Sequence, residues 1–258
     1  MQTDRRIALR VEGLSKRFGG LAAVDGVSFT VREGSIKTII GPNGAGKTTT
    51  FNLLTGVDTP DAGKVLFGDH DISRMPAHEI CRLGMVRTYQ STRLFQDMTV
   101  LQNVMVGQHC RTKSDFILSI LKLPSTRAEE RRIVERAREL LAYMHLEDRA
   151  NELAKNLPYG QQRRLEIARA LATEPKMLLL DEPAAGLNMS ETVAMAEEIA
   201  RIRELGVTVL LIEHRMGLVM DISDEILVLQ FGRQIADGTP AQIQANPVVI
   251  EAYLGKEN

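Results

Sequence analysis

Residues 41–49 read GPNGAGKTT and carry the pattern G-x-x-x-x-G-K-[ST] between an apolar run at 36–40 and a helical stretch starting near Thr48. Glycines let such a loop bend tightly, so that successive backbone N–H groups converge on phosphate oxygens, and the positive end of the following helix favours the same anion. In this pattern Lys47 reaches the β- and γ-phosphates, and the hydroxyl of Thr48 holds Mg²⁺. An incidental glycine-rich turn is the alternative, but the strand and helix flanks argue against it. The pattern therefore predicts a nucleoside triphosphate site built from Gly41, Pro42, Asn43, Gly44, Ala45, Gly46, Lys47, Thr48 and Thr49.

A second group of candidate residues follows a predicted buried strand. Residues 177–182 read MLLLDE, so four apolar residues lead directly into Asp181 and Glu182. Carboxylates at the C-terminal edge of such a strand lie where open α/β sheets bind their ligands. We expect Asp181 to hold Mg²⁺, in part through water, and Glu182 to polarise the water that attacks the γ-phosphate. Two acids that merely cap the helix after Pro183 are the alternative, which the accompanying phosphate-binding pattern disfavours.

The elements that position these residues form two groups of strands. Segments 7–11, 27–31 and 64–67 are short and separated by turns that contain Gly, Asp and Pro, which predicts a small antiparallel sheet. Later segments are apolar throughout and alternate with helices, which predicts a parallel sheet buried on both faces. These later segments are 177–180, 207–212 and 226–229.

Two helical patterns complete the expected architecture. The helix before Gly206, a residue suited to the left-handed C-terminal position, carries one apolar face. That face consists of Val193, Ala196, Ile199, Ile202 and Leu205. From about residue 100 to 160 strand signals disappear, and residues 127–144 carry a second apolar face opposite Arg and Glu residues that we read as solvated. The second face consists of Ile133, Val134, Ala137, Leu140, Leu141 and Met144. The whole stretch is predicted to be a helical subdomain inserted into the α/β core.

Composition narrows the class of protein. The chain has 258 residues, of which 25% are charged and 44% apolar, and a formal net charge of −1. This balance gives no electrostatic argument for binding nucleic acid or an acidic membrane. Cys81 and Cys110 match no disulfide or metal spacing and are expected to be reduced thiols in a cytoplasmic protein. We find neither a signal-peptide pattern nor an apolar run long enough to cross a bilayer, so any membrane role is expected to come through a partner.

A third segment points to a family. Residues 157–164 read LPYGQQRR and lead into the helical sequence RRLEIARALA. Together with the two motifs above and the order of the segments, this resembles the signature region of ATP-binding cassette (ABC) ATPases, over essentially the whole chain. The resemblance implies an α/β fold of the P-loop NTPase class, with a RecA-like core, an N-terminal antiparallel β subdomain and an inserted helical subdomain. It also implies ATP hydrolysis with Mg²⁺ as cofactor.

The resemblance implies one ABC ATPase domain over residues 1–258. Residues 1–90 and 164–258 are expected to form the nucleotide-binding core and the β subdomain. Residues 91–163 are expected to form the helical signature subdomain.

The same resemblance assigns roles to further residues. Phe18 resembles the aromatic residue that stacks on adenine, with a core phenylalanine in a turn as the alternative. Gln90, after a predicted strand from Met85 to Tyr89, resembles the Q-loop glutamine that senses Mg²⁺ and the attacking water, so we count it as both catalytic and metal-binding. His214 resembles the switch histidine that contacts the γ-phosphate, with a structural histidine as the alternative. Residues 184–188, which read AAGLN, resemble the D-loop.

Tyr159, Gly160 and Gln161 fall within the signature, which in this family contacts the γ-phosphate of ATP bound to the opposite subunit. A helix start suits that task, because it offers free N–H groups and a positive end.

Three positions depart from the family pattern, two in the signature Leu-Ser-Gly-Gly-Gln and one in the D-loop. Pro158 stands in place of the serine and Tyr159 in place of the first glycine, so a hydroxyl and an N–H donor are lost. Proline is favoured in the first turn of a helix, so the helix start is expected to survive. Asn188 replaces the usual D-loop aspartate, keeping an acceptor oxygen and losing the charge. These departures bear on contacts with a second subunit rather than on the site within the chain.

Longer segments narrow the resemblance further. They read RFGGLAAVDGVSF, RTYQSTRLFQDMTVLQNV, YGQQRRLEIARAL, DEPAAGLN and NPVVIEAYLG. With the long connection from Gly107 to Thr126, they resemble the LivG-type ATPases of bacterial branched-chain amino acid importers. ATPases of urea import and of lipopolysaccharide export share much of the C-terminal pattern and stay open as alternatives.

The resemblance also implies partners and a location. The partners are integral membrane permease subunits, a second ABC ATPase subunit and, indirectly, an extracytoplasmic amino-acid-binding protein, with no nucleic acid. The location is the cytoplasmic face of the inner membrane. A soluble ABC ATPase acting on DNA or ribosomes is a second hypothesis, although the sequence has no long coiled coil, zinc-binding cysteines or tandem cassette. A module that binds nucleotide passively is a third, against which Glu182 and His214 argue.

The segment from Gln90 to Val100 is the candidate for transmitting the ATP cycle to a membrane partner. Leu94, Phe95, Met98 and Val100 crowd into this short stretch. If some of these side chains are exposed, they form an apolar patch suited to a short helix of a membrane subunit. Local core packing is the alternative.

Overall fold

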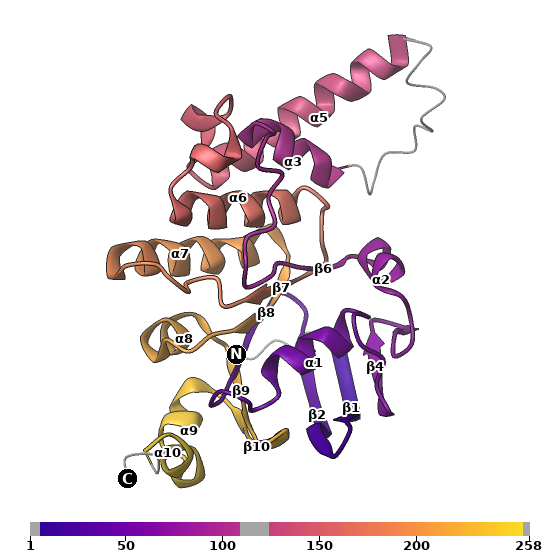
Figure 1. Ribbon diagram of the computed structural model, residues 1–258, viewed down its shortest axis with the longest axis vertical. Helices are drawn as coiled ribbons and strands as arrows, with labels where there is room; N and C mark the ends of the chain where they lie inside the picture. Colours follow the sequence, from indigo (N-terminus) through magenta and orange to yellow (C-terminus); the bar gives the residue numbers. More distant parts are fainter. Residues whose placement is uncertain (1–5, 109–123, 255–258) are drawn as a thin grey trace. The chain divides into compact units, whose positions relative to one another are not determined.

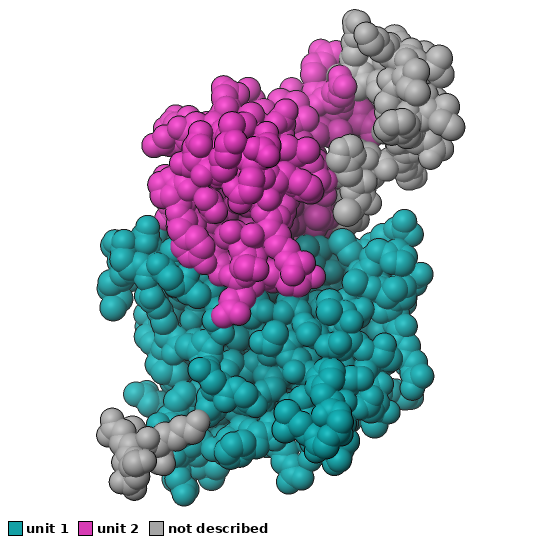
Figure 2. All heavy atoms as spheres, viewed as in Figure 1, with its two compact units in different colours: residues 1–87, 176–258 teal, residues 88–175 magenta. Residues whose placement is uncertain are grey.

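The computed structural model describes residues 6–108 and 124–254, and the chain divides into two compact units. The first unit comprises residues 1–87 and 176–258, and the second comprises residues 88–175 (Figure 2). Helix α6 (Tyr159–Leu171) belongs wholly to the second unit, where it packs against α3 (Val100–Gln108) and α5 (Pro124–Tyr143). The second unit thus extends to Pro175, beyond the boundary at residue 163 that the sequence indicated, because α6 finds its packing partners there.

The first unit contains an antiparallel sheet with strand order β2-β1-β4-β5 (Figure 1). Its strands are β1 (Ile7–Phe18), β2 (Leu21–Arg32), β4 (Ala62–Phe67) and β5 (His70–Asp71). All three predicted N-terminal strands are therefore confirmed, and β1 pairs with both β2 and β4.

A six-stranded sheet with order β10-β9-β3-β8-β7-β6 forms the centre of the first unit. Its strands are β3 (Ile36–Ile40), β6 (Met85–Arg87), β7 (Met177–Asp181), β8 (Thr208–Ile212), β9 (Glu225–Gln230) and β10 (Arg233–Gly238). All neighbours pair in parallel except β10, which is antiparallel to β9. The predicted parallel sheet is confirmed, whereas the strand expected from Met85 to Tyr89 ends at Arg87.

Both faces of this sheet are covered. Ile40 and Val228 belong to a core with α8 (Met216–Ile222), α9 (Pro240–Gln244) and α10 (Pro247–Leu254). Ile39 and Leu227 belong to a second core, which they share with α1 (Lys47–Leu54), α2 (Ala77–Leu83) and the antiparallel sheet. Burial of successive residues on opposite faces explains the continuous apolar runs at 177–180 in β7, 209–212 in β8 and 226–229 in β9.

Helix α7 (Met189–Ile202) and the single 3₁₀ turn η3 (Arg203–Leu205) end at Gly206, whose φ of 79° is the predicted left-handed conformation. The predicted apolar face is partly wrong: Ile199 and Ile202 are buried, but Val193 and Leu205 are exposed. The buried stripe instead starts at Thr192 and runs through Met195 and Glu198. Val193 lies one position, about 100° of helical rotation, away from that stripe. Leu205 lies beyond it because the α-helix has already tightened into η3.

The second unit is helical, as predicted. It contains α3, α5, α6 and the 3₁₀ turns η1 (Glu147–Arg149) and η2 (Ala154–Asn156). On α5 and just beyond it the predicted apolar face is buried at Ala137, Leu140, Leu141 and Met144, and half-buried at Ile133 and Val134. Cys110 and most of the long connection from Gly107 to Thr126 lie outside the described residues. Within 6–108 and 124–254, no helix combines the length and apolar character needed to span a bilayer.

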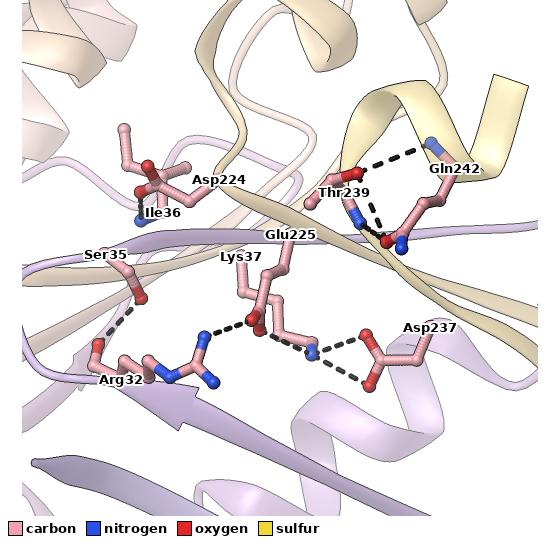
Figure 3. A network of polar contacts seen from close by, with 9 residues as sticks. All are labelled: Arg32, Ser35, Ile36, Lys37, Asp224, Glu225, Asp237, Thr239 and Gln242. Atoms are coloured by element: carbon pink, nitrogen blue, oxygen red, sulfur yellow. Dashed lines mark hydrogen bonds and ion pairs between the residues drawn. The ribbon is translucent and has the colours of Figure 1, made fainter. Parts of the chain in front are cut away.

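A buried lysine links strands of the two sheets of the first unit (Figure 3). The ammonium group of Lys37 on β3 donates to both carboxylate oxygens of Asp237 at 2.7 and 2.9 Å, and to Glu225 at 3.2 Å. Glu225 also accepts from Arg32 of β2 at 2.6 Å. Because four strands contribute to it, this network fixes β2, β3, β9 and β10 relative to one another.

Candidate functional site

The loop of residues 41–49, hereafter the phosphate loop, joins β3 to α1 in a conformation that requires glycine. Gly41 and Gly46 have φ values of 151° and 97°. A Cβ atom on Gly41 would lie 2.1 Å from the carbonyl oxygen of Leu229, and one on Gly46 would lie 2.3 Å from that of Ala23. Any side chain at either position would therefore push the loop off β2 and β9. The glycines of the sequence pattern thus allow the close backbone approach that a phosphate cradle needs.

Lys47 is buried at the start of α1. Its ammonium group donates to the carbonyl oxygens of Gly41 at 2.7 Å and Pro42 at 3.0 Å, so the side chain folds back over the loop. Burial lowers the pKa of Lys47 below the usual lysine value, while the negative charges of Glu182 and Asp181 act in the opposite direction. The structure thus brings the phosphate loop and the end of β7 together, as predicted from two separate motifs.

The residues of this loop fit a bound nucleoside triphosphate. The amide groups of the first turn of α1 have no intrahelical acceptor and lie at the positive end of the helix. The side chain of Thr48 is exposed, whereas Thr50 two residues later is buried and donates to the carbonyl oxygen of Gly46 at 2.9 Å. The hydroxyl of Thr48 is therefore open to a ligand, Thr49 is half-buried, and Thr50 is occupied within the loop.

Asp181 is buried at the end of β7 and forms an ion pair that sequence reasoning missed. Its carboxylate accepts from Arg87 of β6 at 2.6 Å, and both side chains are only 4% exposed. Arg87 also donates to Asn52 of α1 at 2.7 Å and lies over the ring of Phe51, 5.4 Å from its centroid. A buried arginine needs a carboxylate partner, so the charge at the end of β6, directly after Met85 and Val86, could have signalled this pair.

Thr48 in the first turn of α1 and Asp181 at the end of β7 carry oxygen atoms of the kind that Mg²⁺ prefers. In residues 6–108 and 124–254, no group of three or more His, Cys, Asp and Glu side chains is arranged so that it could hold a metal ion. Mg²⁺ at nucleotide sites needs only one or two carboxylates besides the phosphates and water, so this arrangement fits the ion.

Glu182 and His214 form the second polar pair of the site. The Nε2 atom of His214 lies 2.7 Å from Oε1 of Glu182, although the two residues follow different strands, β7 and β8. Glu182 takes a left-handed backbone conformation, with φ of 49°, and its N–H donates to Ile212 at 2.9 Å. The side chain of His214 is 38% exposed, which argues against a purely structural core histidine. A carboxylate and an imidazole in this contact can exchange or orient a proton.

Phe18 ends β1 at the turn into β2. Its side chain is 48% exposed, so the alternative of a core phenylalanine is wrong. The ammonium group of Lys16 lies 5.6 Å from the ring centroid. Phe18 belongs to the β1–β2 pair, and Ala23 of β2 lies against Gly46 of the phosphate loop. An exposed aromatic ring on this strand pair is compatible with stacking on a base.

Gln90, Tyr159, Gly160 and Gln161 lie in the second unit. Helix α6 begins at Tyr159, directly after Pro158, whose carbonyl oxygen accepts from Gln161 at 2.9 Å. The expected survival of this helix start is therefore confirmed. Tyr159 is 42% exposed, and the buried Oε1 of Gln161 has no hydrogen-bond partner among the described residues.

A buried pair on α6 holds the segment that contains Gln90, and sequence reasoning missed it. Arg163 donates to the carbonyl oxygen of Tyr89 at 2.7 Å and also to that of Gln90. Glu166 accepts from the N–H of Arg93 at 2.7 Å, and burial raises the pKa of its carboxyl group. The Gln90 segment is thus attached to the signature helix by two side chains, while the side chain of Gln90 itself is exposed.

Asn188 is the N-cap of α7. Its Oδ1 atom accepts from the N–H of Glu191 at 3.0 Å, and the carboxylate of Glu191 accepts from the N–H of Asn188 at 2.9 Å. Asparagine caps a helix about as well as aspartate, so the departure from the family residue preserves the local structure of this loop.

The apolar segment after Gln90 splits into two pairs. Leu94 and Val100 are buried, so local core packing is the correct interpretation for these two residues. Phe95 and Met98, in contrast, are 47% and 38% exposed. Asn103 fixes the backbone of Phe95 by accepting from its N–H at 2.9 Å and donating to its carbonyl oxygen at 3.0 Å. Of these four apolar side chains, Phe95 and Met98 are therefore the two that can contribute to an exposed patch.

Comparison with known proteins places this chain in a family. Residues 24–185 match the family described as ABC transporter, and residues 233–257 match one described as branched-chain amino acid ATP-binding cassette transporter. The high-affinity branched-chain amino acid transport ATP-binding protein BraF of Pseudomonas aeruginosa is 51% identical over 97% of this chain and 99% of its own length. The corresponding protein LivG of Escherichia coli K12 is 49% identical over 96% of this chain and 98% of its own length.

Solved structures of similar fold belong to the same family as these relatives. The crystal structure of a nucleotide-free ATP-binding cassette from an ABC transporter has a TM-score of 0.84 at 34% identity, covering 97% of this chain and 100% of that one. The ADP conformation of an ATP-binding cassette of an ABC transporter matches with the same score, identity and coverage. The chain therefore belongs to the ABC transporter family, as one of its ATP-hydrolysing subunits.

Proposed function

We propose that this chain energises the high-affinity import of branched-chain amino acids. The observation that carries the proposal is the identity of about one half, over nearly the full length of both chains, with two ATP-binding proteins named for this transport. The match of residues 233–257 to a branched-chain amino acid transporter family supports it at the C-terminus. Urea import and lipopolysaccharide export are the alternative transport functions.

In the proposed mechanism the phosphate loop binds the triphosphate of ATP. Lys47 supplies a positive charge to the phosphates, replacing its present bonds to the loop carbonyls of Gly41 and Pro42. Phe18 stacks on the adenine. Thr48 and Asp181 would hold Mg²⁺, which supplies positive charge against the negative charge that develops on the phosphoryl oxygens.

Glu182 is the proposed general base. Its carboxylate orients the attacking water and accepts a proton from it, while His214 holds the carboxylate in place and contacts the γ-phosphate. The 2.7 Å contact between the two side chains supports this division of roles. Gln90, attached by its backbone to α6, is proposed to report the state of the metal and water to the second unit.

Hydrolysis is proposed to require two cassettes. Tyr159, Gly160 and Gln161 of one subunit would contact the γ-phosphate bound by the other, because they form the first turn of α6, at the positive end of that helix. Pro158 and Tyr159 leave backbone amides, rather than a serine hydroxyl, as the donors of this helix start.

The remaining partners are membrane permease subunits, a second ABC ATPase subunit and, indirectly, an extracytoplasmic amino-acid-binding protein. We place the chain at the cytoplasmic face of the inner membrane and assign it no nucleic-acid partner. The exposed Phe95 and Met98 are the proposed contact for a short helix of a permease subunit.

The test is purification of the tagged chain from its native membrane, followed by identification of the co-purifying proteins. The complex and its binding protein are then placed in liposomes, and ATP-dependent uptake of leucine, isoleucine and valine is compared with that of urea. We expect permease subunits to co-purify and branched-chain amino acids to be taken up. Uptake of urea alone, or co-purification with ribosomes or DNA, would overturn the proposal.

A further inference from the structure

The two residues that flank His214 both bind the segment that follows Glu182. Glu213 is only 2% exposed, and one of its carboxylate oxygens, Oε1, accepts from the N–H of Ala184 at 3.0 Å. The other oxygen, Oε2, accepts from the N–H of His214 at 2.9 Å and from that of Arg215 at 3.2 Å. One buried carboxylate therefore holds three backbone amides, which belong to the two different segments that carry Glu182 and His214.

Arg215 makes a second connection between the same segments. Its guanidinium donates to the carbonyl oxygen of Leu187 at 2.6 Å and to the hydroxyl of Thr192. The hydroxyl of Thr192 donates in turn to the carbonyl oxygen of Asn188 at 2.7 Å. A planar guanidinium with several fixed donors holds such a geometry better than a flexible ammonium group does.

These contacts determine where the backbones of Glu182 and His214 lie. Ala184 is two residues after Glu182, and Glu213 binds its N–H and that of His214 at once. Glu182 itself is attached to the end of β8 through its N–H bond to Ile212 at 2.9 Å. The 2.7 Å separation between the side chains of Glu182 and His214 depends on these backbone positions.

Glu213 cannot be a second general base, because it is buried and its oxygens are occupied by main-chain donors. We propose that Glu213 and Arg215 are positioning residues, which hold the imidazole of His214 against the carboxylate of Glu182 during ATP hydrolysis. This inference rests on the proposed roles of Glu182 and His214. The proposal assigns a role to both neighbours of His214. Glu213 and Arg215 act through the histidine and do not contact ATP themselves.

The first variant is Glu213→Gln. The amide keeps the volume and one acceptor oxygen but places an NH₂ group where a carboxylate oxygen met backbone donors. Since a misplacement of about 1 Å can cost on the order of 10²-fold in rate, we expect kcat to fall about 10- to 100-fold. The KM for ATP and the affinity for ATP should stay within about twofold, because the phosphate loop is untouched. Glu197→Gln on the exposed side of α7 is the control and should hydrolyse ATP normally.

The decisive measurement is a double-mutant cycle with His214→Ala. If Glu213 acts only through the histidine, Glu213→Gln should lower kcat no further in the His214→Ala background, since effects of residues that act as a unit are not additive. Arg215→Met should behave in the same way, and Arg215→Lys should recover part of the rate by donating to Leu187. These results, with ATP affinity retained, support the proposal.

Other outcomes overturn it in distinguishable ways. A normal kcat in both Glu213→Gln and Arg215→Met, alongside a strong loss in His214→Ala, refutes the positioning role and leaves the proposed function intact. Full additivity with His214→Ala, together with weaker ATP binding, shows a general structural role instead. A normal kcat in His214→Ala refutes the assigned role of the histidine and the positioning proposal together.

Discussion

Replacing Lys37 with methionine isolates the contribution of the buried ion network that joins β3 to β10. Methionine keeps an unbranched apolar chain of similar length, so little packing is lost. The change leaves Asp237 without the ammonium group that it meets at 2.7 and 2.9 Å. Glu225 keeps its contact with Arg32 at 2.6 Å, so the unpaired charge falls mainly on Asp237.

The size of the effect follows from the exposure of Asp237. Removing one partner of a fully buried ion pair costs roughly 3–5 kcal/mol. The side chain of Asp237 is 25% exposed, so water can reach it and the cost should be smaller, about 2–3 kcal/mol. For a chain of this size each 1 kcal/mol lowers the melting temperature by roughly 2–4 °C. We expect Lys37→Met to melt about 5–10 °C below the parent protein.

The loss should depend on pH. Burial already raises the pKa of Asp237, against the lowering effect of Lys37, so removing the lysine raises it further. A carboxyl group whose pKa is higher in the folded than in the unfolded state binds its proton first in the folded protein. The variant therefore gains stability relative to the parent as pH falls from neutral toward the unfolded-state pKa of an aspartate.

Thermal melting followed by circular dichroism at pH 5.5, 7 and 8.5 measures both effects. The double variant Lys37→Met with Asp237→Leu is the control, because it removes the buried charge and should recover much of the stability. Equal melting temperatures of Lys37→Met and the parent at every pH would refute the reasoning. A loss of the same size at every pH would show that packing, not the unpaired carboxylate, is responsible.

Three further predictions concern the functional surfaces. Lys47→Ala should weaken ATP binding at least tenfold in equilibrium titration, since a charged phosphate contact is lost; unchanged affinity would remove Lys47 from the site. Glu182→Gln should sediment as a dimer with ATP and as a monomer without it, and a monomer under both conditions would contradict ATP-bridged cassettes. Phe95→Ala should leave the melting temperature and isolated ATPase rate nearly unchanged but weaken co-purification with the permease; a large loss of stability with normal transport would make Phe95 a core residue.

Local motifs predicted the chemistry because their geometry depends on few neighbours. The phosphate loop needs glycine at Gly41 and Gly46 for reasons internal to a strand–loop–helix unit. Asp181 and Glu182 follow an apolar strand whose end was readable from its composition. Such features could be assigned from the sequence before any tertiary contact was known.

Features that depend on distant residues could not be read in the same way. Lys37 lies inside a buried strand and is stable there because Asp237 and Glu225, both far along the chain, pair with it. Arg87 is buried against Asp181 for the same reason. The face of α7 was misassigned because Val193 is apolar yet points to solvent, while the charged Glu198 is buried. For Lys37 and Arg87, tertiary pairing rather than local preference decides burial.

The most direct test of the proposed catalytic site compares ATP binding and ATP hydrolysis in Glu182→Gln. The amide retains the size of the side chain and its contact with His214 but cannot act as a base. We expect kcat to fall about 10²–10³-fold while the dissociation constant for ATP stays unchanged. Hydrolysis near the parent rate, with ATP bound normally, would contradict the assignment of Glu182 and require another residue to activate the water.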